Sequence, residues 1–202
     1  MAYPPFPPRQ TGVTIIELMI TLAIMAILLS LAVPSFEGLI ANTRLSTATN
    51  DLHASLAQAR SEAVRRGQRV TVCVSQNGNQ CSAGNWEQGW ITFVDITRVG
   101  NAPIVDPNDT LLQVAPAAGN GIFIQGQPAV SQYVSFAPDG QSRTMAGGVQ
   151  AGTIEICSTS TALADASRAR DLALNASGQV MMRTIDNAGN QLTVTNNCPT
   201  PP

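Results

Sequence analysis

The sequence predicts an α+β protein, in which a long N-terminal helix packs on an antiparallel β-sheet domain. Three observations lead to this fold class. An apolar run extends from Val13 to Pro34, and apolar residues then recur at helical spacing up to Arg66. After Gly67 the apolar residues alternate, which is typical of β-strands. With 202 residues, one helical segment and one globular domain account for the whole chain.

The apolar run from residue 13 to residue 35 contains one ionisable side chain, Glu17. A helix of this length reaches roughly 30 Å, enough to cross the hydrocarbon core of a bilayer. A carboxylate inside such a segment is costly and needs a partner charge. A secretory signal is disfavoured because its apolar run is usually only ~7–15 residues long. A plain membrane anchor would leave Glu17 unexplained.

Cleavage before the apolar run would provide the partner charge that Glu17 needs. A cut after Gly12 creates an α-amino group on Val13, four residues before Glu17. In an assembly of parallel helices, the ammonium group of one subunit can neutralise the Glu17 carboxylate of its neighbour. Residues 1–12 are then a leader peptide with four prolines and Arg9, and Arg9 favours a cytoplasmic location for this end.

The stretch Gly12-Val13-Thr14-Ile15-Ile16-Glu17-Leu18 resembles the class III signal of type IV pilins and type II secretion pseudopilins. Val13 stands where that family usually has Phe, and Pro34 stands where the family has its helix proline. The resemblance implies that a prepilin peptidase cuts after Gly12 and methylates the amine of Val13. It also implies that residues 13–35 are a transmembrane and assembly helix, with Glu17 and Pro34 as assembly residues.

Residues 36–66 are expected to continue this helix as an amphipathic segment. Pro34 removes one backbone hydrogen bond, so it should bend the helix or loosen one turn. Gly67 follows two arginines and predicts the end of the helix. His53, the single histidine, is interpreted as a solvated helix residue. The stripe predicted to face the domain consists of small and aliphatic residues: Leu45, Ala48, Leu52, Leu56, Ala59 and Ala63.

Residues 67–202 are expected to form a periplasmic domain with roughly seven to nine short antiparallel strands. Trp86 and Trp90 are assigned to its core. Residues 98–109 form a loop, in which Asp106 and Asp109 provide too few oxygen ligands to predict a calcium site. The predicted strands cover residues 69–74, 86–95, 111–115, 122–125, 133–136, 153–157, 172–175, 179–185 and 191–195.

Four cysteines all lie beyond the apolar segment, and they allow three disulfide pairings. We predict that Cys73 pairs with Cys81 across a short Gly/Asn loop, and that Cys157 pairs with Cys198 to tie the tail to an inner strand. A metal site is the alternative, but the C-x-x-C spacing is missing. Disulfides indicate an oxidising compartment, here the periplasm or the cell surface.

Several stretches of the domain resemble the GspH/FimT family of minor pilins and minor pseudopilins. They are the helix end at 56–63, the pattern Trp-x-x-Gly-Trp-Ile-x-Phe-Val-Asp at 86–95, and the turn Phe136-Ala137-Pro138-Asp139-Gly140. The resemblance implies a minor type IV pilin that primes or caps pilus assembly and supports twitching motility, adhesion or DNA uptake. The alternative that it implies is a minor pseudopilin of a type II secretion system.

DNA binding is a third possibility, because some FimT-like pilins have a hairpin with the sequence Gly-Arg-x-Arg that is implicated in holding DNA. Here the matching residues are Gly178-Gln179-Val180-Met181, so both arginines are missing. Arg183 lies two positions further on and offers at most a weak contact. The chain has 11 basic residues against 13 acidic ones, which argues against the several phosphate contacts that DNA affinity requires.

The sequence contains no nucleophile–base pair and no phosphate-binding loop, and its single histidine is expected on the helix. We therefore expect no enzymatic activity, cofactor, metal or small-molecule substrate. The expected partners are other major and minor pilins or pseudopilins, bound through the N-terminal helix, together with prepilin peptidase and the inner membrane. The expected location is a single inner-membrane pass with a periplasmic domain, followed by the pilus or pseudopilus.

Overall fold

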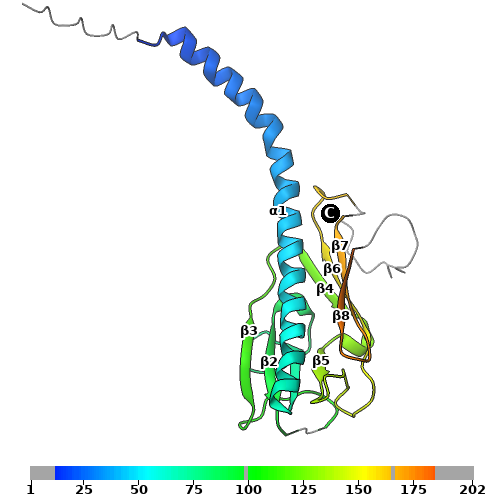
Figure 1. The fold of residues 1–202 in the computed structure, drawn as a ribbon. Helices are drawn as coiled ribbons and strands as arrows, with labels where there is room; N and C mark the ends of the chain where they lie inside the picture. Colours follow the sequence, from blue (N-terminus) through cyan, green and yellow to red (C-terminus); the bar gives the residue numbers. More distant parts are fainter. Residues whose placement is uncertain (1–11, 98–99, 165–166, 185–202) are drawn as a thin grey trace, which may run out of the picture. The chain divides into compact units, whose positions relative to one another are not determined.

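The computed structural model describes residues 12–97, 100–164 and 167–184, without the side chains of residues 31–35 and 184. The chain divides into two compact units, Met1–Glu37 and Gly38–Pro202, and each is treated by itself below. Helix α1, Ile15–Arg66, begins in the first unit and ends in the second (Figure 1). The helix predicted from Val13 therefore starts two residues later, after Thr14.

In the first unit, the described side chains of α1 are exposed and almost all of them are apolar. The backbone is helical through residues 31–35, but Pro34 belongs to the residues whose side chains lie outside the described set. Its predicted effect on the helix stays a prediction. Across the described residues, no helical stretch is both long enough and apolar enough to cross a membrane.

In the second unit, one face of α1 is buried in the core of the domain. All six residues of the predicted stripe are buried, and Leu45, Leu52 and Leu56 have no exposed surface. The helix ends at Arg66, and Gly67 follows with a positive φ of 64°. This conformation suits glycine and confirms the predicted helix end.

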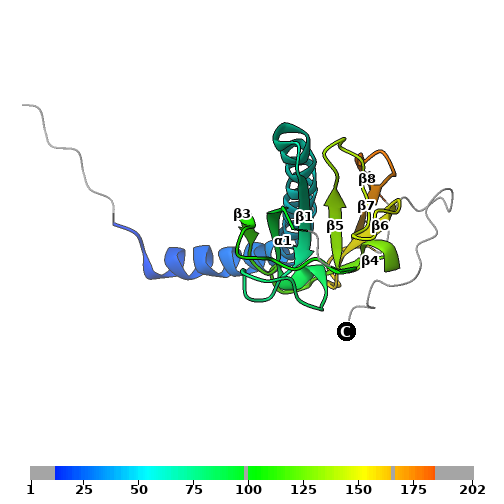
Figure 2. The same cartoon turned by 90° about the horizontal axis from the view of Figure 1, so that it is seen from below.

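Two antiparallel four-stranded sheets pack against this half of α1. The first sheet has the order β3-β2-β1-β5 and the second has the order β4-β6-β7-β8. In Figure 1, β2 and β3 lie on one side of α1 and β4, β6, β7 and β8 on the other, while Figure 2 shows β5 on the side of the first sheet nearer to the second. The strands are β1 Arg69–Val74, β2 Trp90–Asp95, β3 Thr110–Ala115, β4 Ile122–Gly126, β5 Tyr133–Phe136, β6 Gly152–Ser158, β7 Ala169–Leu174 and β8 Val180–Thr184.

The main core lies between α1 and the two sheets, where the apolar stripe of the helix meets inward-facing residues of both sheets. A second, smaller core lies on the other face of the first sheet. It consists of Cys73, Ile91 and Phe93, covered by Cys81, Val105 and Tyr133. β2 is therefore covered on both faces, which explains why all six of its residues are buried.

The structure corrects two of the predicted strands. The strand expected over residues 86–95 is broken, because Trp86–Gln88 forms a 3-10 turn and β2 begins only at Trp90. Gly89, with φ at 105°, makes the break, and a Cβ there would lie 2.8 Å from the Ala115 carbonyl oxygen. β7 begins three residues earlier than predicted, at Ala169. The strand predicted over 191–195 lies outside the described residues.

Both tryptophans have the core position predicted for them. Trp86 is fully buried and Trp90 is 3% exposed. The Trp86 indole donates to the Val130 carbonyl oxygen (3.0 Å), and the Trp90 indole donates to Ser55 Oγ on α1 (3.0 Å). Each buried indole N–H therefore has an acceptor, as a buried donor requires.

Candidate assembly site

The candidate assembly segment is the first unit of the chain, and Glu17 lies in the first turn of its helix. Thr14 caps this helix. Its Oγ1 accepts the backbone N–H of Glu17 (3.3 Å) and its carbonyl oxygen accepts the N–H of Leu18 (3.2 Å). The Glu17 carboxylate therefore lies near the positive end of the helix dipole, which favours a negative charge.

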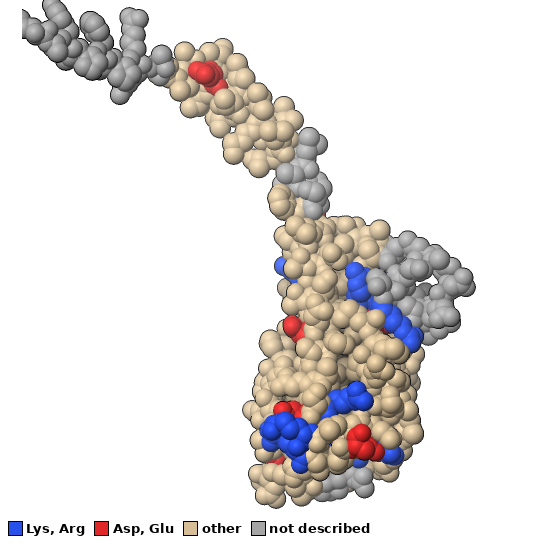
Figure 3. Space-filling view, viewed as in Figure 1, with Lys and Arg blue, Asp and Glu red and all other residues tan. Residues whose placement is uncertain are grey.

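The surroundings of Glu17 are apolar and open. Figure 3 shows the described part of this segment as an uncharged surface with one acidic patch. The neighbouring side chains that are largely exposed in the single chain are Val13, Ile15, Ile16, Leu18, Met19, Ile20, Leu22, Ile24, Met25, Ile27, Leu28 and Leu29. A continuous apolar surface of this kind marks a site of contact with protein or membrane.

The predicted cleavage point lies directly in front of this helix. Gly12, Val13 and Thr14 precede the first helical residue and are exposed. A Cβ added to Gly12 would meet no atom within 4 Å. The bond after Gly12 is thus outside the helix and open to another protein, as a protease requires.

The disulfide predicted between Cys73 and Cys81 is confirmed, with a Cα–Cα distance of 5.6 Å. Within the loop that it closes, Asn77 Oδ1 accepts the backbone N–H groups of Asn79 (2.9 Å) and Gln80 (3.0 Å). Cys157 is also in a disulfide. Its predicted partner, Cys198, lies outside the described residues.

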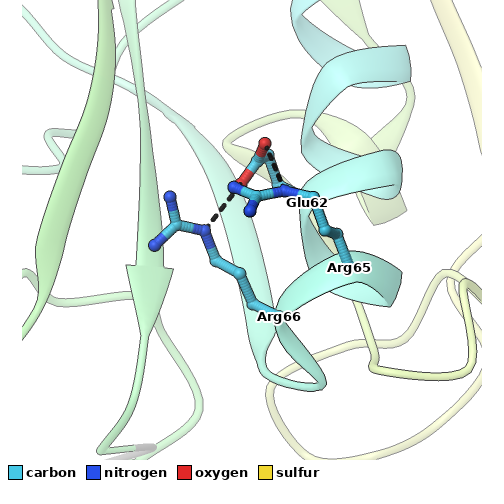
Figure 4. A network of polar contacts seen from close by, with 3 residues as sticks. All are labelled: Glu62, Arg65 and Arg66. Carbon is cyan, nitrogen blue, oxygen red and sulfur yellow. Dashed lines mark hydrogen bonds and ion pairs between the residues drawn. The ribbon is translucent and has the colours of Figure 1, made fainter.

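The two arginines at the end of α1 share one acidic partner, Glu62. Glu62 bonds both Arg65 and Arg66, each at 2.6 Å (Figure 4). These hydrogen bonds lower the pKa of Glu62 below its usual value. On the face shown in Figure 3, basic side chains form separate groups and not a continuous stripe, so this face lacks the extended basic surface typical of nucleic-acid binding.

The turn between β7 and β8, the stretch considered for DNA binding, contacts both α1 and the turn at Gly140. Arg60 of α1 donates from Nε to the Gly140 carbonyl oxygen and from Nη2 to that of Ser177, both at 3.0 Å. Arg183, the candidate weak DNA contact, is exposed on β8 and is the Cα partner of Asp171 on β7. Arg60 thus lies next to this turn, but its guanidinium group is bound to the carbonyl oxygens of Gly140 and Ser177, so it links the two turns to α1.

Two acidic residues face each other across β6 and β7, where Glu155 is the Cα partner of Asp171. Desolvation and the nearby charge of Asp171 raise the pKa of Glu155 to about 7, although Arg168 opposes the shift. Desolvation also raises the pKa of Asp171, with Arg183 opposing it. Sequence reasoning missed this pair, because strand alternation alone does not show which residues of two distant strands are in register.

Asp106 and Asp109 organise the loop before β3. Asp109 accepts the backbone N–H groups of Ile96 (2.9 Å) and Asp106 (2.8 Å), and Asp106 accepts the Thr97 hydroxyl (2.6 Å). Among the residues with described positions, no group of three or more metal-binding side chains comes together.

A groove of about 440 Å³ lies between α1 and the segment that includes β3 and the residues after it. Its α1 wall includes Thr43, Thr47 and Asp51, and its other wall includes Gln113 and Ala115, with Trp90 also lining it. Arg44 lines the same groove and donates to the Asn120 carbonyl oxygen (3.4 Å), linking the helix to the loop before β4. The lining is mainly small and apolar, with charged groups on the helix side.

Comparison with known proteins identifies both parts of the chain. Residues 48–178 match the family model "Type II transport protein GspH", and residues 7–33 match the "Prokaryotic N-terminal methylation motif". Two Pseudomonas aeruginosa sequences named "Fimbrial protein" are each 28% identical over 119 residues, which is 58% of this chain and 75% of theirs.

A solved structure has the same fold. The type IV minor pilin FimU of Pseudomonas aeruginosa aligns with a TM-score of 0.50 at 19% sequence identity, covering 70% of this chain and 89% of FimU. The family match spans more than half of the chain, from the buried half of α1 to the hairpin at Gly178. Together with the methylation motif, it shows that the chain belongs to the GspH family of pilins and pseudopilins, which are structural subunits that associate with other pilins.

Proposed function

We propose that this chain is a minor type IV pilin that primes or caps the assembly of a pilus. Prepilin peptidase cleaves it after Gly12 and methylates the new N-terminus at Val13. Residues 13–35 anchor it in the inner membrane, residues 36–66 continue the stem, and the domain from residue 67 lies in the periplasm. The similarity to fimbrial proteins and to the fold of FimU supports the type IV pilus as its destination.

The observation that supports this most directly is the position of Glu17. It is the single acid within residues 13–35, in the first helical turn and four residues after the predicted new N-terminus. Inside a bundle of stems its charge would have to be compensated. The Val13 ammonium group of a neighbouring stem supplies that compensation, and the pair also fixes the axial register between two subunits.

The test replaces Glu17 with alanine in the full-length chain. Glu17→Ala should leave cleavage intact but strongly reduce the amount of this chain in sheared fibres, because the register-setting charge is gone. Glu37→Ala is the matched control, since Glu37 is also an exposed acid on α1. Equal recovery of Glu17→Ala and wild-type chain in fibres would refute the charge-pairing argument.

Processing is tested separately by the mass of the mature chain. Gly12→Ala should leave most of the chain at its precursor mass, because the substitution adds a Cβ to the glycine that the motif has directly before the cut. A normal mature mass for this variant would place the cleavage site elsewhere.

The second candidate is a minor pseudopilin of a type II secretion system, and the description of the matching family model favours it. Both functions use the same stem and the same domain. Deletion of the gene separates them when surface pili and secreted proteins are scored in parallel. Loss of pili with normal secretion supports the pilin, whereas retained pili with cargo trapped in the periplasm supports the pseudopilin.

A further inference from the structure

β3 is an edge strand, and one bulge interrupts its ladder with β2, because Leu111 and Gln113 pair with the adjacent residues Phe93 and Thr92. It forms one end of the first sheet and pairs with β2 alone. Its sequence, Thr-Leu-Leu-Gln-Val-Ala, has no charge and no proline, and Leu111 and Val114 are 40% and 50% exposed. An open, uncharged apolar edge readily pairs with another strand, so proteins usually block it with charges, bulges or covering segments.

The opposite edge of the same sheet is blocked. The buried Gln150 side chain accepts the N–H of Ser135 on β5 (2.9 Å) and donates to the Tyr133 carbonyl oxygen (2.9 Å). The Arg143 backbone N–H donates to the Ser135 carbonyl oxygen (2.9 Å). One amide side chain and one loop thus occupy the hydrogen-bonding positions that a further strand would use.

The β4 edge of the second sheet is also blocked, because Glu87 Oε2 accepts the N–H of Ile124 (3.0 Å). On β3 nothing comparable is present. Among the described residues, no loop or side chain makes a hydrogen bond to the β3 backbone beyond its ladder with β2. Of the three edges β3, β4 and β5, β3 is the one without such a hydrogen bond among the described residues.

The groove described above adjoins this open edge. A strand added to β3 would lie about 4.8 Å from it, with alternate side chains directed to opposite faces. On the α1 side these side chains would meet the groove lined by Trp90, Ala115 and Thr47. On the other face they would lie beside Leu111 or Val114. Backbone pairing would then provide affinity and the groove would provide side-chain selectivity.

We propose that β3 receives an extended strand from a neighbouring pilin subunit, which adds to the first sheet and fills the α1–β3 groove. The donated strand is uncharged and has small or β-branched apolar side chains on both faces, because both faces that receive it are mainly apolar. This inference rests on the association of the chain with other pilins. It holds for a pilus and for a pseudopilus.

The experiment places a photo-crosslinking amino acid at Val114 of the full-length chain in cells. The same amino acid at Val149, which is 65% exposed, is the surface control. Placed at Leu22, the photo-crosslinking amino acid reports contacts of the N-terminal helix. Adducts are identified by mass spectrometry down to the linked peptide. The expected result is an adduct from position 114 to an extended segment of a different pilin or pseudopilin, and none from position 149.

A charge on the edge gives an independent readout. Val114→Lys should lower the recovery of the chain in sheared fibres about tenfold, whereas Val149→Lys should leave it near wild type. Membrane levels and formation of the Cys73–Cys81 bridge show that each variant folds.

Each alternative result overturns the proposal in a recognisable way. An adduct from position 114 to β3 of a second copy would mean that the edge pairs with itself. Adducts from position 22 but none from position 114 would support the proposed function and refute strand pairing at β3. If neither position 22 nor position 114 crosslinks to a pilin, both the proposed function and the proposed strand pairing at β3 are refuted.

Discussion

Gly178→Ala should be among the most destabilising single-methyl changes in this domain. Gly178 lies in the turn between β7 and β8, with φ at 77°, and it contacts the turn at Gly140. A Cβ at this position would lie 2.1 Å from the Gly140 carbonyl oxygen and 3.2 Å from Arg60 Nε. That carbonyl is backbone and is itself held by Arg60, so it cannot move away without breaking the contact with α1.

The expected magnitude follows from two terms. A left-handed conformation costs a non-glycine residue roughly 1–2 kcal/mol, and forcing an extra carbon into a packed site costs about 1–3 kcal/mol more. Gly67→Ala separates the terms, because Gly67 has φ at 64° and a Cβ there would meet nothing within 4 Å. We expect a loss of unfolding free energy of about 3–4 kcal/mol for Gly178→Ala and about 1–2 kcal/mol for Gly67→Ala.

Urea unfolding of the full-length chain in detergent measures both variants, with the fluorescence of the buried Trp86 and Trp90 as the signal. At slopes of roughly 1–3 kcal/mol per molar urea, the two midpoints should differ by about 1 M. If Gly178→Ala is no less stable than Gly67→Ala, the three-way contact of α1 with the turns at Gly140 and Gly178 is not the rigid junction described above.

Three further predictions concern the same domain. Arg60→Met should lower the unfolding free energy by about 1–2 kcal/mol, because the carbonyl groups of Gly140 and Ser177 lose their donors, and a urea midpoint equal to wild type would contradict this. The pKa of Glu155, raised from 4.5 to about 7 in the folded state, means that the folded chain binds more protons between these pH values, so stability should fall as the pH rises through this window. Glu155→Gln should flatten that pH profile, and an unchanged slope would show that Glu155 is not responsible. Replacing both Cys73 and Cys81 with serine should cost about 2–3 kcal/mol for a bridge that spans eight residues, as measured by thermal unfolding against the wild-type chain.

The elements with a clear period were predictable from the sequence. The buried stripe of α1 was predicted at all six positions because helical spacing repeats over several turns, and Gly67 ends the helix where its backbone requires glycine. Strands with β-branched alternation, such as β1, also agree with the prediction. In these cases the local sequence and the tertiary environment favour the same structure.

The features that could not be predicted depend on contacts between distant residues. The break at Gly89 exists because the Ala115 carbonyl oxygen approaches the backbone there, and Gly89 and Ala115 lie 26 positions apart in the sequence. The blocking of β5 by Gln150 and of β4 by Glu87 likewise depends on sheet order. For the candidate site, the sequence indicated Gly12, Val13 and Glu17 through a short motif, whereas the open edge of β3 has no local signature.

The contrast between blocked and open edges has a physical explanation in assembly. A secreted monomer with an open apolar strand would risk pairing with any extended chain, and a single lysine on β3 would remove that risk at little cost. β3 instead has Leu111 and Val114 exposed, while the same domain uses Gln150 and Glu87 to close other edges. An assembled pilin is surrounded by neighbouring subunits, and one of these can cover an edge of this kind. The exposure of β3 in the single chain is thus the expected state of an interface strand whose partner is not bound.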